Sequence, residues 1–225
     1  MAWIAGPIFG QVNVEKFREE PNAHISASFS LSETRTTKTN RQSVNLLFNR
    51  IFEKHEVLAV GGLGFGEQNS EDFQKNSFLH LRYFYKIGSW GPEAFGQDQQ
   101  NRFSNLRERN VYGVGLRKIF KGETHHFRGG ISLMKERLRL ESFEDTISTD
   151  RLNHYLSYVH KYFATTLYYQ PNLKNFRDKN LTFDGLISLS LIKEKLMLDF
   201  FLGYTENSTR DIKDRFFRQT LRFNF

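Results

Sequence analysis

The stretch FRGGISL, which begins at Phe127, alternates between apolar and polar or small side chains with a period of two residues. Phe127, Ile131 and Leu133 would lie on one face of an extended chain, and Arg128 and Ser132 on the other. A period of two is the signature of a β-strand that has one apolar and one polar face. This stretch therefore predicts a strand.

Segments with the same alternation recur about every sixteen residues, and twelve of them can be placed. We expect strands at residues 24–36, 39–52, 55–68, 74–87, 90–102, 107–121, 124–139, 149–162, 164–175, 179–193, 195–207 and 212–225. The repetition predicts an all-β fold that occupies residues 24–225.

The connections between these segments alternate in length. Short ones, such as Glu53-Lys54 and Gly88-Ser89, take turns with longer polar ones, such as Glu67 to Lys75, Lys135 to Arg151 and Asn172 to Lys179. Tight turns at one end and longer loops at the other are typical of an up-and-down antiparallel β-barrel.

The length of the segments favours a barrel that crosses a membrane. Each has about twelve residues or more, and a tilted strand needs roughly 9–11 residues to cross a bilayer. Twelve strands enclose an interior too wide for small polar side chains to fill easily, so we expect the apolar face to meet lipid. An even number of strands places both chain ends on one side. The alternative is that the Phe residues form the ordinary core of a soluble β-protein.

Aromatic side chains lie near the short-turn ends of the segments, as an interfacial girdle would. They are Phe52, Tyr85, Trp90, Phe120, Phe127, Tyr162, Phe163 and Phe225.

Composition excludes several classes of protein. No uncharged apolar run of 18 residues occurs, which argues against membrane helices. The chain has no cysteine, so disulfides, cysteine-ligated zinc and cysteine nucleophiles are absent. The net charge of +7 favours anionic partners such as lipid headgroups. We expect no nucleic-acid binding, because the basic residues are spread along the chain and form no single stripe.

The chain ends in Arg218–Phe225, where apolar Leu221, Phe223 and Phe225 alternate with polar residues. This ending resembles the C-terminal signal of bacterial outer-membrane barrels, which the barrel-assembly machinery reads. More specifically, the sequence resembles the YdiY-like family of salt-induced outer-membrane proteins. The resemblance covers nearly the whole chain from residue 12 and rests on the order and spacing of several blocks: Val12–Glu15, Ser26–Leu31, Asn110–Leu116, Tyr158–Tyr162, Leu167–Leu173 and Leu202–Tyr204.

This resemblance implies an outer-membrane barrel with periplasmic turns and termini, and extracellular longer loops. It implies no established chemistry. Residues 1–23 precede the first expected strand, and they would be a remnant of the export signal, a plug, a handle for a periplasmic partner or a frayed terminus.

Charged side chains on the polar face of the expected strands would point into the barrel. These candidates are His80, Arg82, Arg117, Arg128, Glu136, Asp184, Asp199, Arg218 and Arg222. They would form either a constriction that favours anions or a lattice of arginine–carboxylate pairs that braces the wall. Five arginines against three carboxylates predict a net positive lumen.

The sequence gives little sign of catalysis, and we expect no enzyme activity, cofactor or metal site. His154 and Ser157 lie three residues apart and would point to opposite faces of a strand, so they cannot pair directly. The Ser–His pair that a membrane-embedded hydrolase needs is therefore not found in the sequence.

Two basic clusters on the long-loop side are candidates for contact with the phosphates of lipopolysaccharide. They comprise Arg35, Lys38 and Arg41 after the first strand, and Lys174, Arg177 and Lys179 after the ninth. Exposed loop charges can also be merely solvated.

The leading functional hypothesis is a passive, weakly anion-selective diffusion channel for small solutes. The alternative is a non-conducting structural barrel that anchors a periplasmic or surface partner protein in the outer membrane.

Overall fold

The computed structural model describes residues 22–33, 38–68, 71–101, 106–160, 162–192, 196–209 and 211–223. The segment expected at residues 1–23 therefore lies outside the described residues, except for Asn22 and Ala23, which belong to the first strand. Side chains are described for residues 42–67, 75–101, 106–160, 162–192, 196–209, 211 and 213–221.

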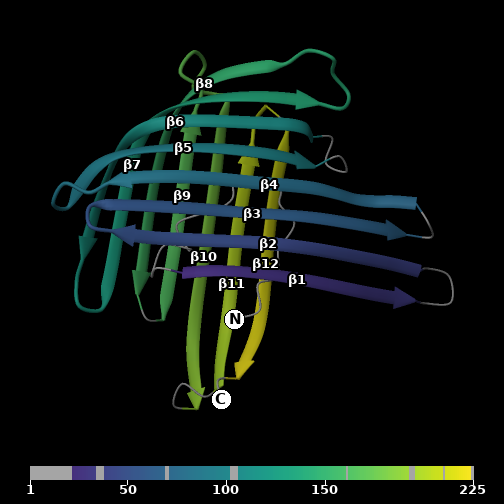
Figure 1. Cartoon of the computed structure of the whole chain (residues 1–225), viewed down its shortest axis with the longest axis horizontal. Helices are drawn as coiled ribbons and strands as arrows, with labels where there is room; N and C mark the ends of the chain where they lie inside the picture. The colour runs from purple at the N-terminus through teal and green to yellow at the C-terminus, as the bar shows by residue number, and fades with distance from the viewer. Residues whose placement is uncertain are drawn as a thin grey trace. The chain divides into compact units, whose positions relative to one another are not determined.

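Twelve antiparallel strands follow one another in chain order in a single sheet. Figure 1 labels them β1 to β12. They are β1 (Asn22–Glu33), β2 (Lys38–Phe52), β3 (His55–Gln68), β4 (Glu71–Tyr85), β5 (Trp90–Asn101), β6 (Leu106–Lys121), β7 (His125–Leu140), β8 (Ile147–His160), β9 (Phe163–Pro171), β10 (Lys179–Ile192), β11 (Leu196–Asn207) and β12 (Ile212–Phe223). The all-β, up-and-down antiparallel fold with about twelve strands is confirmed.

Among the described residues, no helix is long and apolar enough to cross a membrane.

The contacts divide the chain into two compact units. One unit comprises Leu116–Ser132 together with the chain from Arg151 onward. The other comprises the described residues from 22 to 115 together with Leu133–Asp150. Each unit is described by itself below.

Two of the three longer connections, the one after β3 and the one after β7, are shorter than the sequence suggests, because the strands continue into polar segments. The connection expected from Glu67 to Lys75 is mostly strand, since β3 reaches Gln68 and β4 begins at Glu71. Backbone hydrogen bonds of a ladder form whatever the side chain is, so polar residues end the apolar pattern without ending the strand. For the same reason Lys38 and Arg41 lie within β2 and not in a loop.

The tight turn at Glu53-Lys54 joins β2 to β3 with two residues, as expected. Glu53 adopts a φ of 52°, in the left-handed region that non-glycine residues seldom occupy. Gly88, in the turn between β4 and β5, adopts the same left-handed conformation with a φ of 64°.

Burial alternates along the strands, and it is the polar face that is buried. On β7, Arg128 and Ser132 are 5% and 2% exposed, whereas Ile131 and Leu133 are 46% and 58% exposed. The same inversion holds on β6, where Arg117 is buried and Val114 is 62% exposed. We call the buried side of the strands the inner face and the exposed apolar side the outer face.

Some apolar side chains also occupy the inner face. In the unit that contains Gly115, Phe95, Val111 and Met134 form a buried cluster. The ring of Phe95 lies against Gly113, where a Cβ would overlap it. A glycine at this position lets an aromatic side chain cover the neighbouring strand.

Candidate functional site

A buried ion pair joins β4 to β5 on the inner face. Arg82 Nη1 lies 3.6 Å from Glu93 Oε2, and both side chains are completely buried. The guanidinium carbon of Arg82 also lies 5.0 Å from the ring centroid of Phe95. Nearby, His80 Nδ1 and Gln97 Oε1 lie 3.3 Å apart. Burying an arginine costs several kcal/mol unless a carboxylate compensates it, so Glu93 allows Arg82 to be buried.

A second buried pair joins β6 to β7 within the same unit. Arg109 Nε donates to Glu136 Oε1 over 2.6 Å, and Arg109 Nη1 donates to Gln99 Oε1 over 3.4 Å. Glu136 was among the predicted inner residues, and Arg109 was not. Arg109 and Arg117 lie eight residues apart on β6, so they share one face of the strand. The alternation that predicts Arg117 as an inner residue therefore also predicts Arg109.

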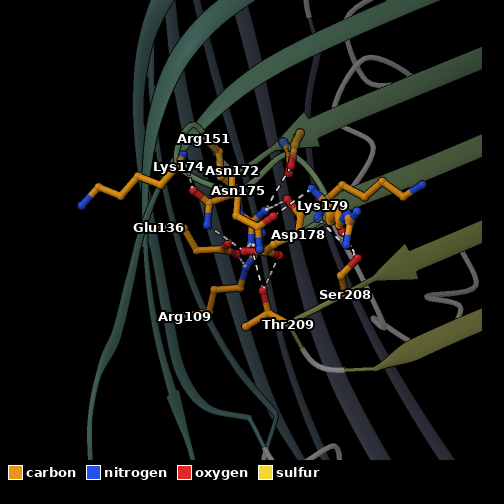
Figure 2. A network of polar contacts seen from close by, with 12 residues as sticks. Arg109, Glu136, Arg151, Asn172, Lys174, Asn175, Asp178, Lys179, Ser208 and Thr209 are labelled. Carbon is orange, nitrogen blue, oxygen red and sulfur yellow. Dashed lines mark hydrogen bonds and ion pairs between the residues drawn. The ribbon is translucent and has the colours of Figure 1, made fainter.

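In the other unit, polar contacts gather around Asp178, and we call this network the Asp178 latch. Figure 2 draws it together with Arg109 and Glu136 of the unit that contains Gly115. Arg151, on β8, donates from Nη2 to Asp178 Oδ1 and Oδ2 over 3.1 and 3.3 Å. Asp178 also accepts hydrogen bonds from Thr209 Oγ1 and Asn172 Nδ2, each over 2.9 Å. One carboxylate thereby ties β8, the β9–β10 connection and the β11–β12 turn together.

Arg151 completes the latch with a further contact. Its Nη1 donates to the backbone oxygen of Gln170 over 3.1 Å, and its side chain is fully buried. Neither Arg151 nor Asp178 was among the predicted site residues.

Further hydrogen bonds between polar side chains lie on the inner face of this unit. Ser188 Oγ donates to Asp199 Oδ1 over 2.6 Å between β10 and β11. Asn153, on β8, donates to Ser132 Oγ over 2.9 Å and accepts from Gln170 Nε2 over 2.7 Å.

The structure buries six of the nine predicted inner residues: His80, Arg82, Arg117, Arg128, Glu136 and Asp199. Asp184 and Arg218 are half-buried, and Arg218 lies with its guanidinium carbon 4.3 Å from the ring centroid of Phe201. Arg222 belongs to β12, but its side chain lies outside the described part of the chain.

The inner face, over the described residues, has more carboxylates than the three that were predicted. Its arginines are Arg82, Arg109, Arg117, Arg128, Arg151 and Arg218, which makes six. Its carboxylates, with the latch residue included, are Glu56, Glu93, Glu136, Asp178, Asp184 and Asp199, which also makes six. The positive excess expected from five arginines and three carboxylates is therefore balanced among the described side chains.

The predicted lipopolysaccharide contacts fall into two groups. Lys174 and Arg177 are exposed in the connection between β9 and β10. Lys179 is the first residue of β10, and its Nζ atom lies 3.9 Å from Oε1 of Glu206. Lys38 and Arg41 have only their backbone described, and Arg35 lies outside the described residues.

The predicted assembly signal is described in part. Leu221 is 51% exposed and faces Leu198 of β11 across the antiparallel register. Phe223 ends β12, and Phe225 lies outside the described residues.

His154 and Ser157 do not form a catalytic pair. Ser157 is buried on the inner face, where Thr166 Oγ1 donates to its hydroxyl over 3.2 Å. The ring of His154 stacks instead on Tyr169, with centroids 6.4 Å apart. Within the described residues, no group of three His, Asp or Glu side chains is placed to hold a metal ion.

Residues 22–147 match the family described as "Protein of unknown function, DUF481". The chain belongs to this family. It is the YdiY-like family that the sequence resembles, so that prediction is confirmed. No curated protein matches the chain.

Two solved structures of autotransporters are similar to this DUF481 member. The β domain of the Bordetella autotransporter BrkA is 10% identical, with 89% of this chain and 97% of that chain covered and a TM-score of 0.34. The translocator domain of the autotransporter NalP from Neisseria meningitidis is 9% identical, with 94% and 91% covered and a TM-score of 0.38. Likeness at this level carries no argument about function.

Proposed function

We propose that the protein is a closed β-barrel of the bacterial outer membrane, with both termini in the periplasm, that serves as a non-conducting structural barrel. In this proposal β1 pairs with β12, and the outer face meets lipid. The protein would anchor a periplasmic or surface partner through residues 1–23 or its loops.

The observation that carries the membrane location is the inverted burial of the strands. Large apolar side chains such as Val114, Leu133 and Phe217 are 58–62% exposed, whereas Arg82, Arg117 and Arg151 are at most 2% exposed. Water would penalise this arrangement, because exposed apolar area costs about 25 cal/mol per Å². In a bilayer the same arrangement is favourable, since the outer face meets hydrocarbon.

The packing of the inner face supports a barrel that does not conduct. A side chain that lines a water-filled pore keeps much of its area accessible to water. Arg82, Glu93, Arg109 and Glu136 are instead 2–5% exposed and hydrogen-bonded or ion-paired across neighbouring strands. Such pairs brace the wall and leave few charges available to a passing ion.

A weakly anion-selective channel for small solutes is the second candidate. The observation that favours it is the greater accessibility of the inner face near β12, where Arg218 is half-buried and Phe216 is 50% exposed. Phe216 lies opposite Gly203 and Arg218 opposite Phe201 in the β11–β12 register, so these side chains share one face. A path along this face would carry an arginine, which favours anions.

Planar-bilayer recording distinguishes the two functions. We expect the refolded full-length protein to give no steady conductance in a salt gradient, because its inner charges are paired and buried. Insertion is verified independently by the heat-dependent gel mobility of the same sample.

Steady conductance with an anion-selective reversal potential would overturn the non-conducting barrel and support the channel. In that case Arg218→Gln should reduce the selectivity, whereas the outer-face control Val114→Ala should leave it unchanged. Conductance that appears only when residues 1–21 are deleted would identify that segment as a plug.

A further inference from the structure

The connection between β9 and β10 is held in a defined conformation by its own hydrogen bonds. Asn172 N donates to Asp178 O over 2.8 Å, and Asp178 N donates to Asn175 O over 2.9 Å. The side-chain oxygens of Asn172 and Asn175 accept from the backbone nitrogens of Lys174 and Arg177 over 2.8 and 3.2 Å. The segment is therefore ordered without belonging to a strand.

The only acidic residue of this connection is Asp178, and the latch occupies its carboxylate. Arg151, Thr209 and Asn172 all donate to it. The two cations of the connection, Lys174 and Arg177, remain exposed. Figure 2 shows the side chain of Lys174 reaching away from the network. The two fully exposed charges of the connection are thus both positive.

Two large apolar side chains are exposed beside these cations. Leu173 is 40% exposed and Phe176 is 61% exposed. We call Leu173, Lys174, Phe176 and Arg177 the basic–apolar loop. A surface that offers cations and apolar side chains together matches the boundary between phosphate headgroups and acyl chains.

The length of β9 places this loop near such a boundary if the strands cross a membrane. β9 has nine residues, Phe163–Pro171, which is about the number that a tilted strand needs to span a bilayer. The neighbouring strands β8 and β10 have 14 residues each. The loop would therefore leave the bilayer at its surface.

We propose that the basic–apolar loop binds the phosphorylated headgroup of lipopolysaccharide in the surrounding membrane. The inference rests on the outer-membrane location proposed above. The Arg177 guanidinium and the Lys174 ammonium would donate charge-assisted hydrogen bonds to lipid phosphates. Leu173 and Phe176 would enter the adjoining acyl region.

The test uses the full-length protein in phosphatidylcholine nanodiscs, with purified lipopolysaccharide as the probe and surface plasmon resonance as the measurement. Lys174→Gln/Arg177→Gln is expected to weaken binding about tenfold, because two charge-assisted contacts are lost. Phe176→Ser is expected to weaken it about fivefold through lost apolar burial. Dephosphorylated lipopolysaccharide should have the same weak affinity for the wild-type chain and for Lys174→Gln/Arg177→Gln.

The matched control is Lys54→Gln/Lys121→Gln, which removes the same charge from exposed residues outside the β9–β10 connection. An equal loss of binding in this control would overturn the proposal, because net charge alone would then explain the effect. Unchanged binding by Lys174→Gln/Arg177→Gln would also overturn the proposal. Full displacement of lipopolysaccharide by millimolar inorganic phosphate would overturn it as well. Failure of every variant and the wild type to enter nanodiscs would instead count against the proposed membrane location.

Discussion

Glu93→Gln is expected to lower the free energy of unfolding by about 3–5 kcal/mol, the usual cost of leaving a buried ion without its partner. Glu93 and Arg82 form an ion pair whose side chains have no exposed area. The amide of glutamine keeps the shape of the glutamate side chain but removes the charge that compensates Arg82. Urea unfolding of the refolded protein in detergent micelles measures the change.

The control for Glu93→Gln is Glu144→Gln, because Glu144 is exposed in the connection after β7. That variant should change stability by less than about 0.5 kcal/mol. A double variant, Arg82→Met/Glu93→Leu, should recover most of the stability, since a buried pair can often be replaced by apolar residues. Equal stability of Glu93→Gln and wild type would show that the pair does not support the fold.

Asp178→Ala is expected to destabilise the β9–β10 connection by about 2–4 kcal/mol, because Arg151 loses the carboxylate that compensates its charge. The cost is smaller than at Glu93 because the Asp178 side chain is 20% exposed, so water replaces part of the interaction. Trypsin cleavage after Lys174 and Arg177, followed by mass spectrometry, reports the opening of this segment. Cleavage there should accelerate at least about 30-fold, since about 1.4 kcal/mol is tenfold in an equilibrium.

The exposed residue Asp145 provides the matched control. Asp145→Ala should leave the cleavage rate after Lys174 and Arg177 unchanged. Thr209→Val removes two hydrogen bonds from the latch, the one donated to Asp178 and the one accepted from Arg151. Because the Arg151–Asp178 ion pair remains, the cleavage rate should rise by an intermediate amount, which corresponds to a destabilisation of about 1 kcal/mol. Rapid cleavage of the wild-type chain at these two positions would contradict a latched connection.

The strands could be predicted from the sequence because burial on one face imposes a period of two residues locally. The segment expected at 39–52 is Lys38–Phe52, and the one expected at 55–68 is His55–Gln68. The predicted strand ends were less accurate where the sequence becomes more polar. The strand expected to end at residue 175 ends at Pro171, because the chain then folds into the hydrogen-bonded connection that contains Asn172 and Asp178.

Alternation along the strands predicts part of the inner face, but it does not predict which charged side chains pair. Alternation alone selects Arg82, whereas its partner Glu93 lies in WGPEAFGQDQQN, where small residues blur the pattern. Which carboxylate meets which arginine depends on the register between strands, and register is a non-local property. The role of Asp178 was harder still to predict, because the residue lies outside the strands and no periodic pattern includes it.

The most direct test of the account asks which face of β7 meets lipid. The chain has no cysteine, so single cysteines at Leu133 and Met134 can be labelled cleanly. Leu133 is 58% exposed and Met134 is 3% exposed. After reconstitution into lipid vesicles, a nitroxide at residue 133 should collide with oxygen, which dissolves in hydrocarbon, and not with a water-soluble nickel complex. The thiol at residue 134 should resist labelling in the folded protein. A label at residue 133 that collides mainly with the nickel complex, or a readily labelled thiol at residue 134, would contradict a barrel with its apolar face in lipid and its polar face inside.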